Sequence, residues 1–188
     1  AGRARRHNVI RRVLAALCIA ALAGCATVVA PPALPPTTDA QAETAWARVL
    51  DRFVDGRGAV DFKALAADRG DLDRMLRHVA DTPLNRFAGT RARLAHMINA
   101  YNALSMANVI DSGIPKTHAG WNRLRFFVLR RFDIGGSTLS LYAFENGVIR
   151  PYTRRIGEPR VHFALNCSAV SCPLLPRRPF EAATLDAQ

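Results

Sequence analysis

Lysine is scarce in this chain of 188 residues, because only Lys63 and Lys116 stand among its 26 basic residues. No basic run is interleaved with aromatic residues, so we expect no nucleic-acid partner, although the formal net charge is +11. No internal repeat is visible, which argues against a repeat architecture. Hydrophobic residues make up 49% and charged residues 22% of the chain, which is the balance of a globular protein and not of a disordered one.

Acidic residues are missing from the start of the chain, where no Asp or Glu precedes Asp39. Five arginines lie within the first 12 residues, and removing them from the 26 bases leaves 21 bases against 15 acids. The remainder of the chain therefore has a net charge of about +6, and its arginine-rich start needs a separate explanation.

A long hydrophobic run is also missing at the N-terminus. Residues 13–23 are apolar, but a helix that spans a membrane needs about 20 apolar residues. A basic flank, a short apolar run and then small residues are typical of a secretory signal. The sequence therefore predicts a signal peptide over residues 1–24.

The segment Leu22-Ala23-Gly24-Cys25 resembles the lipobox of bacterial lipoproteins. This resemblance implies that the Cys25 thiol receives a diacylglycerol and that the peptide before it is removed. Several acyl chains together make a lasting membrane anchor. Because Ala26 and not Asp follows the cysteine, the resemblance implies an outer-membrane lipoprotein that faces the periplasm.

Prolines and small residues follow the cysteine. Four prolines in a short, nearly uncharged stretch predict an extended tether over residues 25–42. The remaining residues, 43–188, have the length of a single globular domain.

The clearest helical pattern runs from about Arg91 to Asp111, with Thr90 as the predicted N-cap and Gly113 as the predicted stop. Two shorter amphipathic helices precede it, and the second ends before Pro83. The apolar positions of these two helices are Trp46, Val49, Leu50 and Phe53, then Leu72, Met75, Leu76 and Val79.

Extended structure is predicted later in the chain. Residues 126–134 alternate loosely, and the pair Gly135-Gly136 follows, which predicts a β-hairpin with residues 138–140. Because helices come first and strands later, we expect the α+β class, with N-terminal helices packed on a small antiparallel sheet.

Two further elements carry polar residues of interest. Ser140 is predicted to cap a helix over residues 141–150, and Glu145 lies in the middle of its apolar arc. Residues 161–165 are predicted to form a strand, with His162 on one of its faces.

A carboxylate, an imidazole and a thiol occur in this order as Glu145, His162 and Cys167. In thiol catalysis, a thiolate attacks a carbonyl, an imidazole shuttles the proton and a carboxylate orients the imidazole. Cys167 lies just after the predicted strand, on a loop, and an orienting role would explain an acid on an apolar face. Candidate substrate or oxyanion contacts are Asn102, Asn166 and Asn99, although the two on the long helix fit hydrogen bonds from helix to loop better.

Two alternatives use the same residues. Cys167 and Cys172 are close enough in sequence to form a disulfide, which an oxidising compartment favours. A metal site with His162 lacks a fourth ligand and a known spacing, so we predict no metal and no cofactor.

Three ordered segments, residues 97–104, 140–150 and 159–173, resemble the domain-of-unknown-function family 547. The resemblance covers roughly residues 45–188. The family usually has an aromatic pair where His96-Met97 stands here. Members usually continue well past the position of Gln188, so we expect this chain to be truncated and its domain incomplete.

The order Glu145, His162, Cys167 is similar to that of papain-like and transglutaminase-like thiol hydrolases, so the resemblance implies a fold of that kind. Plant members carry serine where Cys172 stands, which implies that the motif does not require a disulfide. We therefore expect a membrane-tethered thiol hydrolase that acts on a peptide or amide bond in the envelope. The alternative is a non-catalytic binding or scaffold lipoprotein with a Cys167–Cys172 disulfide.

Overall fold

The structure is a computed structural model that describes residues 26–169 and 172–188. The predicted signal peptide over residues 1–24 and the predicted lipid attachment site, Cys25, lie outside the described residues.

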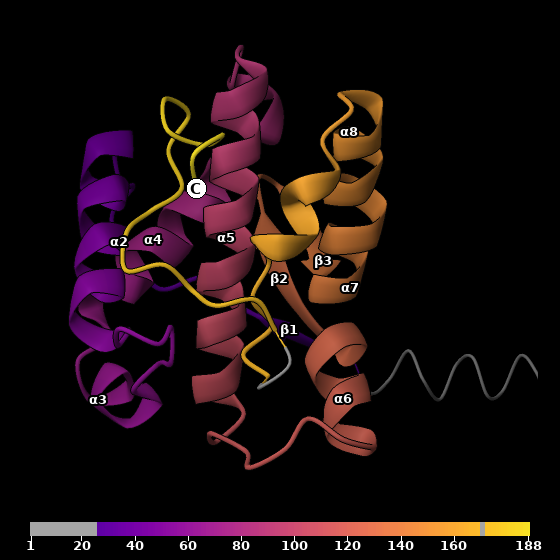
Figure 1. Cartoon of the computed structure of the whole chain (residues 1–188). Coiled ribbons are helices and arrows are strands. Elements are labelled where there is room, and N and C mark those ends of the chain that lie inside the picture. Colours follow the sequence, from indigo (N-terminus) through magenta and orange to yellow (C-terminus); the bar gives the residue numbers. More distant parts are fainter. Residues whose placement is uncertain (1–25, 170–171) are drawn as a thin grey trace, which may run out of the picture.

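A single long helix, α5 (Thr90–Asp111), forms the centre of the molecule. Every residue of this helix from Leu94 to Val109 is buried, as expected for a helix that is packed on all sides. Helices α2, α3 and α4 cover one side of α5, and α7 and α8 cover the other (Figure 1). The helix predicted over about Arg91–Asp111 is therefore confirmed, and it is the element against which the others pack. The predicted N-cap is wrong, because Thr90 is the first helical residue and Gly89 is the N-cap.

The end of α5 follows from its sequence. Gly113 has a positive φ of 78°, which glycine adopts without steric strain. Its N–H bonds to the carbonyl of Ile110, and the N–H of Ile114 bonds to the carbonyl of Val109. These two bonds make a Schellman motif, as the predicted stop at Gly113 requires.

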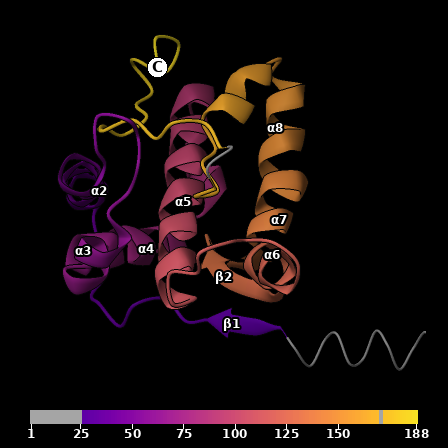
Figure 2. The same ribbon diagram turned by 60° about the horizontal axis from the view of Figure 1, so that its bottom comes forward.

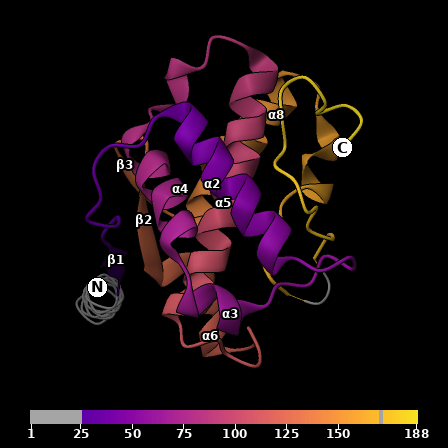
Figure 3. The same cartoon turned by 90° about the vertical axis from the view of Figure 1, so that its left-hand side faces the viewer.

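The two amphipathic helices predicted before α5 are present and lie side by side as α2 and α4 (Figure 3). All eight of the predicted apolar positions are buried: Trp46, Val49, Leu50, Phe53, Leu72, Met75, Leu76 and Val79. The elements of this half are α2 (Asp39–Phe53), α3 (Phe62–Ala67), α4 (Gly70–Asp81) and the 3-10 turn η1 (Leu84–Arg86).

Three short strands form one sheet in the order β1-β2-β3, namely β1 (Thr27–Val29), β2 (Arg130–Ile134) and β3 (Ser137–Ser140). Strands β2 and β3 make the predicted hairpin, in which Gly135 and Gly136 have φ values of 56° and 84°. Two positive φ values in a two-residue loop match the twist of a hairpin. The hairpin begins at residue 130 and not at 126, because Arg125–Leu129 is a π-helical turn, η2, that continues the short helix α6 (Trp121–Leu124).

Strand β1 departs from two predictions, namely a purely antiparallel sheet and a domain that begins at residue 43. It pairs in parallel with β2, so the sheet is mixed and not purely antiparallel. Its residues fall inside the segment predicted as a tether over 25–42, and α2 begins at Asp39. Val29 packs against the core, so the folded part of the chain begins before residue 43.

The helix predicted over residues 141–150 is present in three parts: α7 (Leu141–Ala143), the π-helical turn η3 (Phe144–Ile149) and α8 (Arg150–Arg155). The hydroxyl of Ser140 caps it by accepting from the N–H of Ala143 at 3.1 Å. Pro151 has no N–H to bond the carbonyl four residues before it, which favours the wider turn of η3.

The strand predicted over residues 161–165 is wrong. Pro159–Phe163 form a 3-10 helix, η4. Glu158 caps its start by accepting from the N–H of Arg160 at 3.0 Å, and Pro159 provides a φ suited to a helical first residue. These local interactions favour a 3-10 helix over the strand that the alternation of polar and apolar residues predicted. After η4, the chain crosses α5, and the residues described there, 164–169 and 172–188, form no strand or α-helix (Figures 1 and 2).

Candidate functional site

Asn102 on α5 fixes the start of the crossing segment. Its side chain is 2% exposed. The side-chain amide donates to the carbonyl of Ala164 at 3.0 Å and accepts from the N–H of Asn166 at 2.8 Å. An amide side chain thus pairs with the main chain on both sides of Leu165, much as a neighbouring strand would. The structure assigns to Asn102 a helix-to-loop contact, which was the simpler of the two predicted roles.

Asn99, one turn earlier on α5, fixes the same segment further along. Its amide donates to the carbonyl of Phe180 at 2.8 Å and accepts from the N–H of Phe180 at 3.0 Å. The same oxygen accepts from the indole of Trp46 at 3.1 Å, which links α2 to this contact. In both asparagines, the side-chain oxygen and one side-chain N–H therefore form hydrogen bonds inside the protein.

The loop between these two contacts is closed on itself. Cys167 and Cys172 form a disulfide with a Cα–Cα distance of 6.1 Å. The side chain of Asn166 accepts from the N–H of Ser168 at 2.7 Å and donates to the carbonyl of Pro173 at 2.7 Å. Asn166 is therefore an organiser of the loop, and Cys167, the candidate nucleophile, carries no free thiol in this structure.

Glu145 has the partners that an acid on an apolar helix face requires. Its carboxylate, 17% exposed, accepts from the Tyr101 hydroxyl at 3.0 Å and from two nitrogens of Arg150 at 3.0 and 2.6 Å. Burial, and then the charge of Glu145, raise the pKa of the Tyr101 phenol, so the phenol stays protonated and donates. The predicted partner was His162, and the structure brings Arg150 and Tyr101 there in its place.

His162 lies on η4 with an exposed side chain, next to Phe163, which is 78% exposed. No hydrogen bond joins its imidazole to Glu145 or to Cys167 in the part of the chain that the structure describes. Of the three residues predicted to form a catalytic triad, the acid is engaged in an ion pair and the sulfur in a disulfide.

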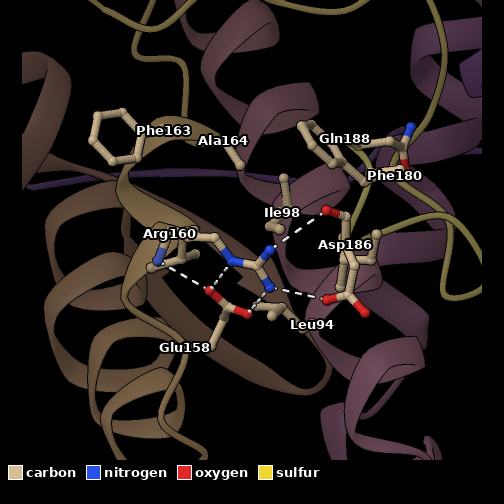
Figure 4. A pocket seen from close by; sticks show the side chains of 12 residues that line it. Leu94, Ile98, Glu158, Arg160, Phe163, Ala164, Phe180, Asp186 and Gln188 are labelled. Atoms are coloured by element: carbon tan, nitrogen blue, oxygen red, sulfur yellow. Dashed lines mark hydrogen bonds and ion pairs between the residues drawn. The ribbon is translucent and has the colours of Figure 1, made fainter.

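A cavity of about 330 Å³ lies between η4 and α5 (Figure 4). Leu94, Ile98 and Phe180 contribute apolar atoms to its lining. The guanidinium of Arg160 bonds Glu158 at 2.8 Å and Asp186 at 2.9 Å, so its charge is neutralised within the protein. Arg160 is therefore poorly placed to bind an anionic substrate.

The partners of Glu145 were missed from the sequence although one signal was present. Glu145 and Arg150 are five residues apart, a spacing that separates two side chains in an α-helix. In the wider π-helical turn, residues five apart lie over each other. Pro151 is the sequence feature that indicated this π-helical turn, because a proline at that place disfavours regular α-helical hydrogen bonds.

Two further findings bear on the kind of protein. Nowhere in residues 26–169 and 172–188 do three or more His, Cys, Asp or Glu side chains converge to hold a metal ion. None of the helices formed by these residues has both the length and the hydropathy that a membrane-spanning helix needs.

Fold and site together define an α+β domain in which a central helix carries two asparagines that fix a disulfide-closed segment. A family model described as "Protein of unknown function, DUF547" matches residues 85–188, more than half of the chain. The chain belongs to this family, as its three motifs indicated, although the match begins later than the predicted residue 45. No curated protein and no solved structure matches the chain, so the predicted papain-like fold has no structural neighbour in its support.

Proposed function

We propose that this protein is a lipid-anchored envelope protein that acts by binding or scaffolding and carries a structural disulfide between Cys167 and Cys172. The proposal is supported by the bonds that the two candidate catalytic groups, the sulfur of Cys167 and the carboxylate of Glu145, already make. The sulfur of Cys167 is bonded to Cys172, and the carboxylate of Glu145 is bonded to Arg150 and Tyr101. A thiol hydrolase needs a free thiolate beside a base.

The redox state of the mature protein tests this proposal. The protein is isolated in the presence of a maleimide, with and without prior reduction, and the added mass is measured. We expect no label on Cys167 or Cys172 before reduction and two labels after it. Two labels without reduction would overturn the disulfide, and with it the main support for a non-catalytic role.

The anchor is the second part of the proposal. Its support is the basic flank, the short apolar run and the segment Leu22-Ala23-Gly24-Cys25. Replacing Cys25 by Ser should release the protein from membranes, and mass spectrometry of the wild type should find acyl chains on residue 25. Persistence of the Cys25→Ser protein in the membrane fraction would contradict this assignment.

A second candidate function is a thiol hydrolase that works only after the disulfide is reduced. Two observations favour it. Cys167 and Cys172 are both partly accessible, and the exposed His162 lies five residues before Cys167. Iodoacetamide labelling of the reduced protein tests it, because a catalytic thiolate has a depressed pKa. Rapid labelling of Cys167 below pH 7, lost on replacing His162 by Ala, would favour the hydrolase. Slow labelling that is indifferent to this replacement would favour the binding protein.

A further inference from the structure

The distance between the predicted anchor and the folded domain is short. Only Ala26 separates Cys25 from Thr27, the first residue of β1, and Thr27 is paired with Arg130 of β2. Two residues of extended chain span at most about 7 Å. A lipid attached to Cys25 is therefore joined to the edge of the sheet almost directly, and the domain cannot stand away from the lipid surface on a long tether.

The strand register decides which part of the domain lies beside the anchor. Because β1 and β2 are parallel, the start of β1 lies beside the start of β2. Residue 130 directly follows the π-helical turn η2, which itself continues α6. Figures 1 and 2 both place β1 and α6 at the same end of the molecule. We call this end, made of β1, α6, η2 and the first residues of β2, the basal face.

The charge of the basal face is uniformly positive. Between Asp111 and Asp133 the chain contains no acidic residue, but four arginines and one lysine. Arg123, Arg125 and Arg131 are exposed and take part in no ion pair with the residues that the structure describes. The arginines of α2 and α4 contrast with them, since each is paired with an aspartate: Arg48, Arg52, Arg74 and Arg77.

Exposed apolar side chains lie on the same elements. Trp121 is 59% exposed, Val28 is 58% exposed and Val128 is 39% exposed. Val28 is the register partner of Arg131, so an apolar and a basic side chain are neighbours on the sheet. Tryptophan and arginine together are typical of the boundary between water and lipid, where the indole ring sits at the level of the headgroups and cations attract anionic lipids.

We propose that the basal face rests on an anionic phospholipid surface, with Trp121 in the headgroup layer. This inference depends on the proposed anchor at Cys25, and it adds an orientation, in which α6 and β1 face the lipid. The membrane is the occupant that we assign, because the anchor holds this face against lipid and the unpaired cations complement anionic headgroups.

Tryptophan fluorescence of the mature lipidated protein in vesicles tests the proposal. The chain contains two tryptophans, and Trp46 is only 1% exposed whereas Trp121 is accessible. The vesicles contain phosphatidylethanolamine with a minority of phosphatidylglycerol, and their acyl chains are brominated near the headgroup. We expect bromine to quench most of the emission of Trp121 and to leave that of Trp46.

The Trp121→Phe protein is the matched control, because it keeps the core tryptophan and changes only an exposed side chain. It should lose the quenching seen in the wild type. Replacing Arg123 and Arg125 by Glu should also reduce the quenching without releasing the protein from the vesicles.

Three results would overturn the orientation, and they are distinct from one another. Protein that floats with the vesicles but is not quenched would have its anchor without the proposed contact. Trp121 that is shielded from acrylamide but not quenched by bromine would assign the face to a protein partner. Absence of acyl chains on Cys25 would remove the proposed anchor and the orientation together, whereas the first two results leave the anchor standing.

Discussion

Asn102 holds the main chain of Asn166 by accepting from its N–H at 2.8 Å, across 64 residues of sequence. The same amide donates to the carbonyl of Ala164, and the side chain is buried. Replacing Asn102 by Ala leaves the N–H of Asn166 and the C=O of Ala164, both in partly buried residues, without this partner. One fully buried unsatisfied group costs about 1 to 3 kcal/mol, and the partial exposure of these two groups keeps their joint cost within about that range. We expect Asn102→Ala to lower the free energy of unfolding by about that amount.

Hydrogen exchange distinguishes this effect from a general loss of packing. In Asn102→Ala, the amide of Asn166 should exchange faster by a larger factor than the amides in the middle of α5. Asn102→Asp separates the two contacts, because it keeps an acceptor for Asn166 but replaces the donor to Ala164 by a buried carboxylate. It should lower the free energy of unfolding and still slow the exchange of the Asn166 amide relative to the Ala protein. Equal acceleration throughout the domain in the Ala protein would contradict a local role.

The ion pair of Glu145 leads to a second prediction. The Glu145 carboxylate holds Arg150 and the hydroxyl of Tyr101, so its removal by Glu145→Ala leaves two donors without their acceptor. We expect a loss of about 1 to 3 kcal/mol in the free energy of unfolding, measured by urea denaturation. Tyr101→Phe should lose less, because the ion pair with Arg150 persists.

A double-mutant cycle of Glu145→Ala with Arg150→Ala isolates their interaction. Partners in one hydrogen-bonded network usually couple by about 0.5 to 3 kcal/mol. A coupling energy near zero would contradict a stabilising ion pair between Glu145 and Arg150. It would also reopen the prediction that Glu145 orients His162.

The local sequence pattern was sufficient to predict the helices and the hairpin, but it did not predict the complete sheet or the contacts of the candidate site. The apolar periodicity of α2 and α4, the helix stop at Gly113 and the Gly135-Gly136 turn are properties of short windows, and they were predicted correctly. The burial of α5 on all sides was not predicted, because it depends on elements from both halves of the chain. The parallel pairing of β1 with β2 joins residues about 100 positions apart and has no local signal. The strand predicted over residues 161–165 failed because a proline and a capping glutamate favour a 3-10 turn there.

The candidate site was predicted only in part for the same reason. Glu145 was correctly expected to need a partner, since a buried carboxylate is costly when unpaired. The identity of that partner depended on the π-helical turn, which brings Arg150 over Glu145. The sequence order of Glu145, His162 and Cys167 did not fix their distances in space, because order along a chain does not determine contacts.

The hairpin turn gives a matched pair of glycines for a third prediction. Both have positive φ, but a Cβ on Gly135 would lie 2.7 Å from the carbonyl oxygen of Thr82, whereas a Cβ on Gly136 would meet nothing within 4 Å. Gly136→Ala should lower the free energy of unfolding by about 1 kcal/mol, from the backbone conformation alone. Gly135→Ala should lower it by clearly more, because the hairpin must also move away from the end of α4. Equal losses for the two variants would contradict the close approach.

His96 stands where the family usually has an aromatic residue, and its ring lies 4.5 Å from that of Phe87. Its side chain is buried, and its Nε2 has no hydrogen-bond partner in the described residues. Burial, together with the neighbouring His78, lowers the pKa of His96 to about 4 from 6.5. The folded protein therefore takes up a proton at His96 less readily than the unfolded chain does.

The free energy of unfolding should therefore depend on pH between 6.5 and about 4. Between pH 6.5 and about 4, the unfolded chain binds a proton at His96 that the folded protein does not, so the free energy of unfolding decreases as the pH falls. The full loss is of the order of 3 kcal/mol, reached near pH 4. His96→Phe keeps an aromatic ring beside Phe87 and cannot titrate, so its urea midpoint should vary less between pH 7 and pH 5. An unchanged slope in His96→Phe would show that other groups cause the pH dependence.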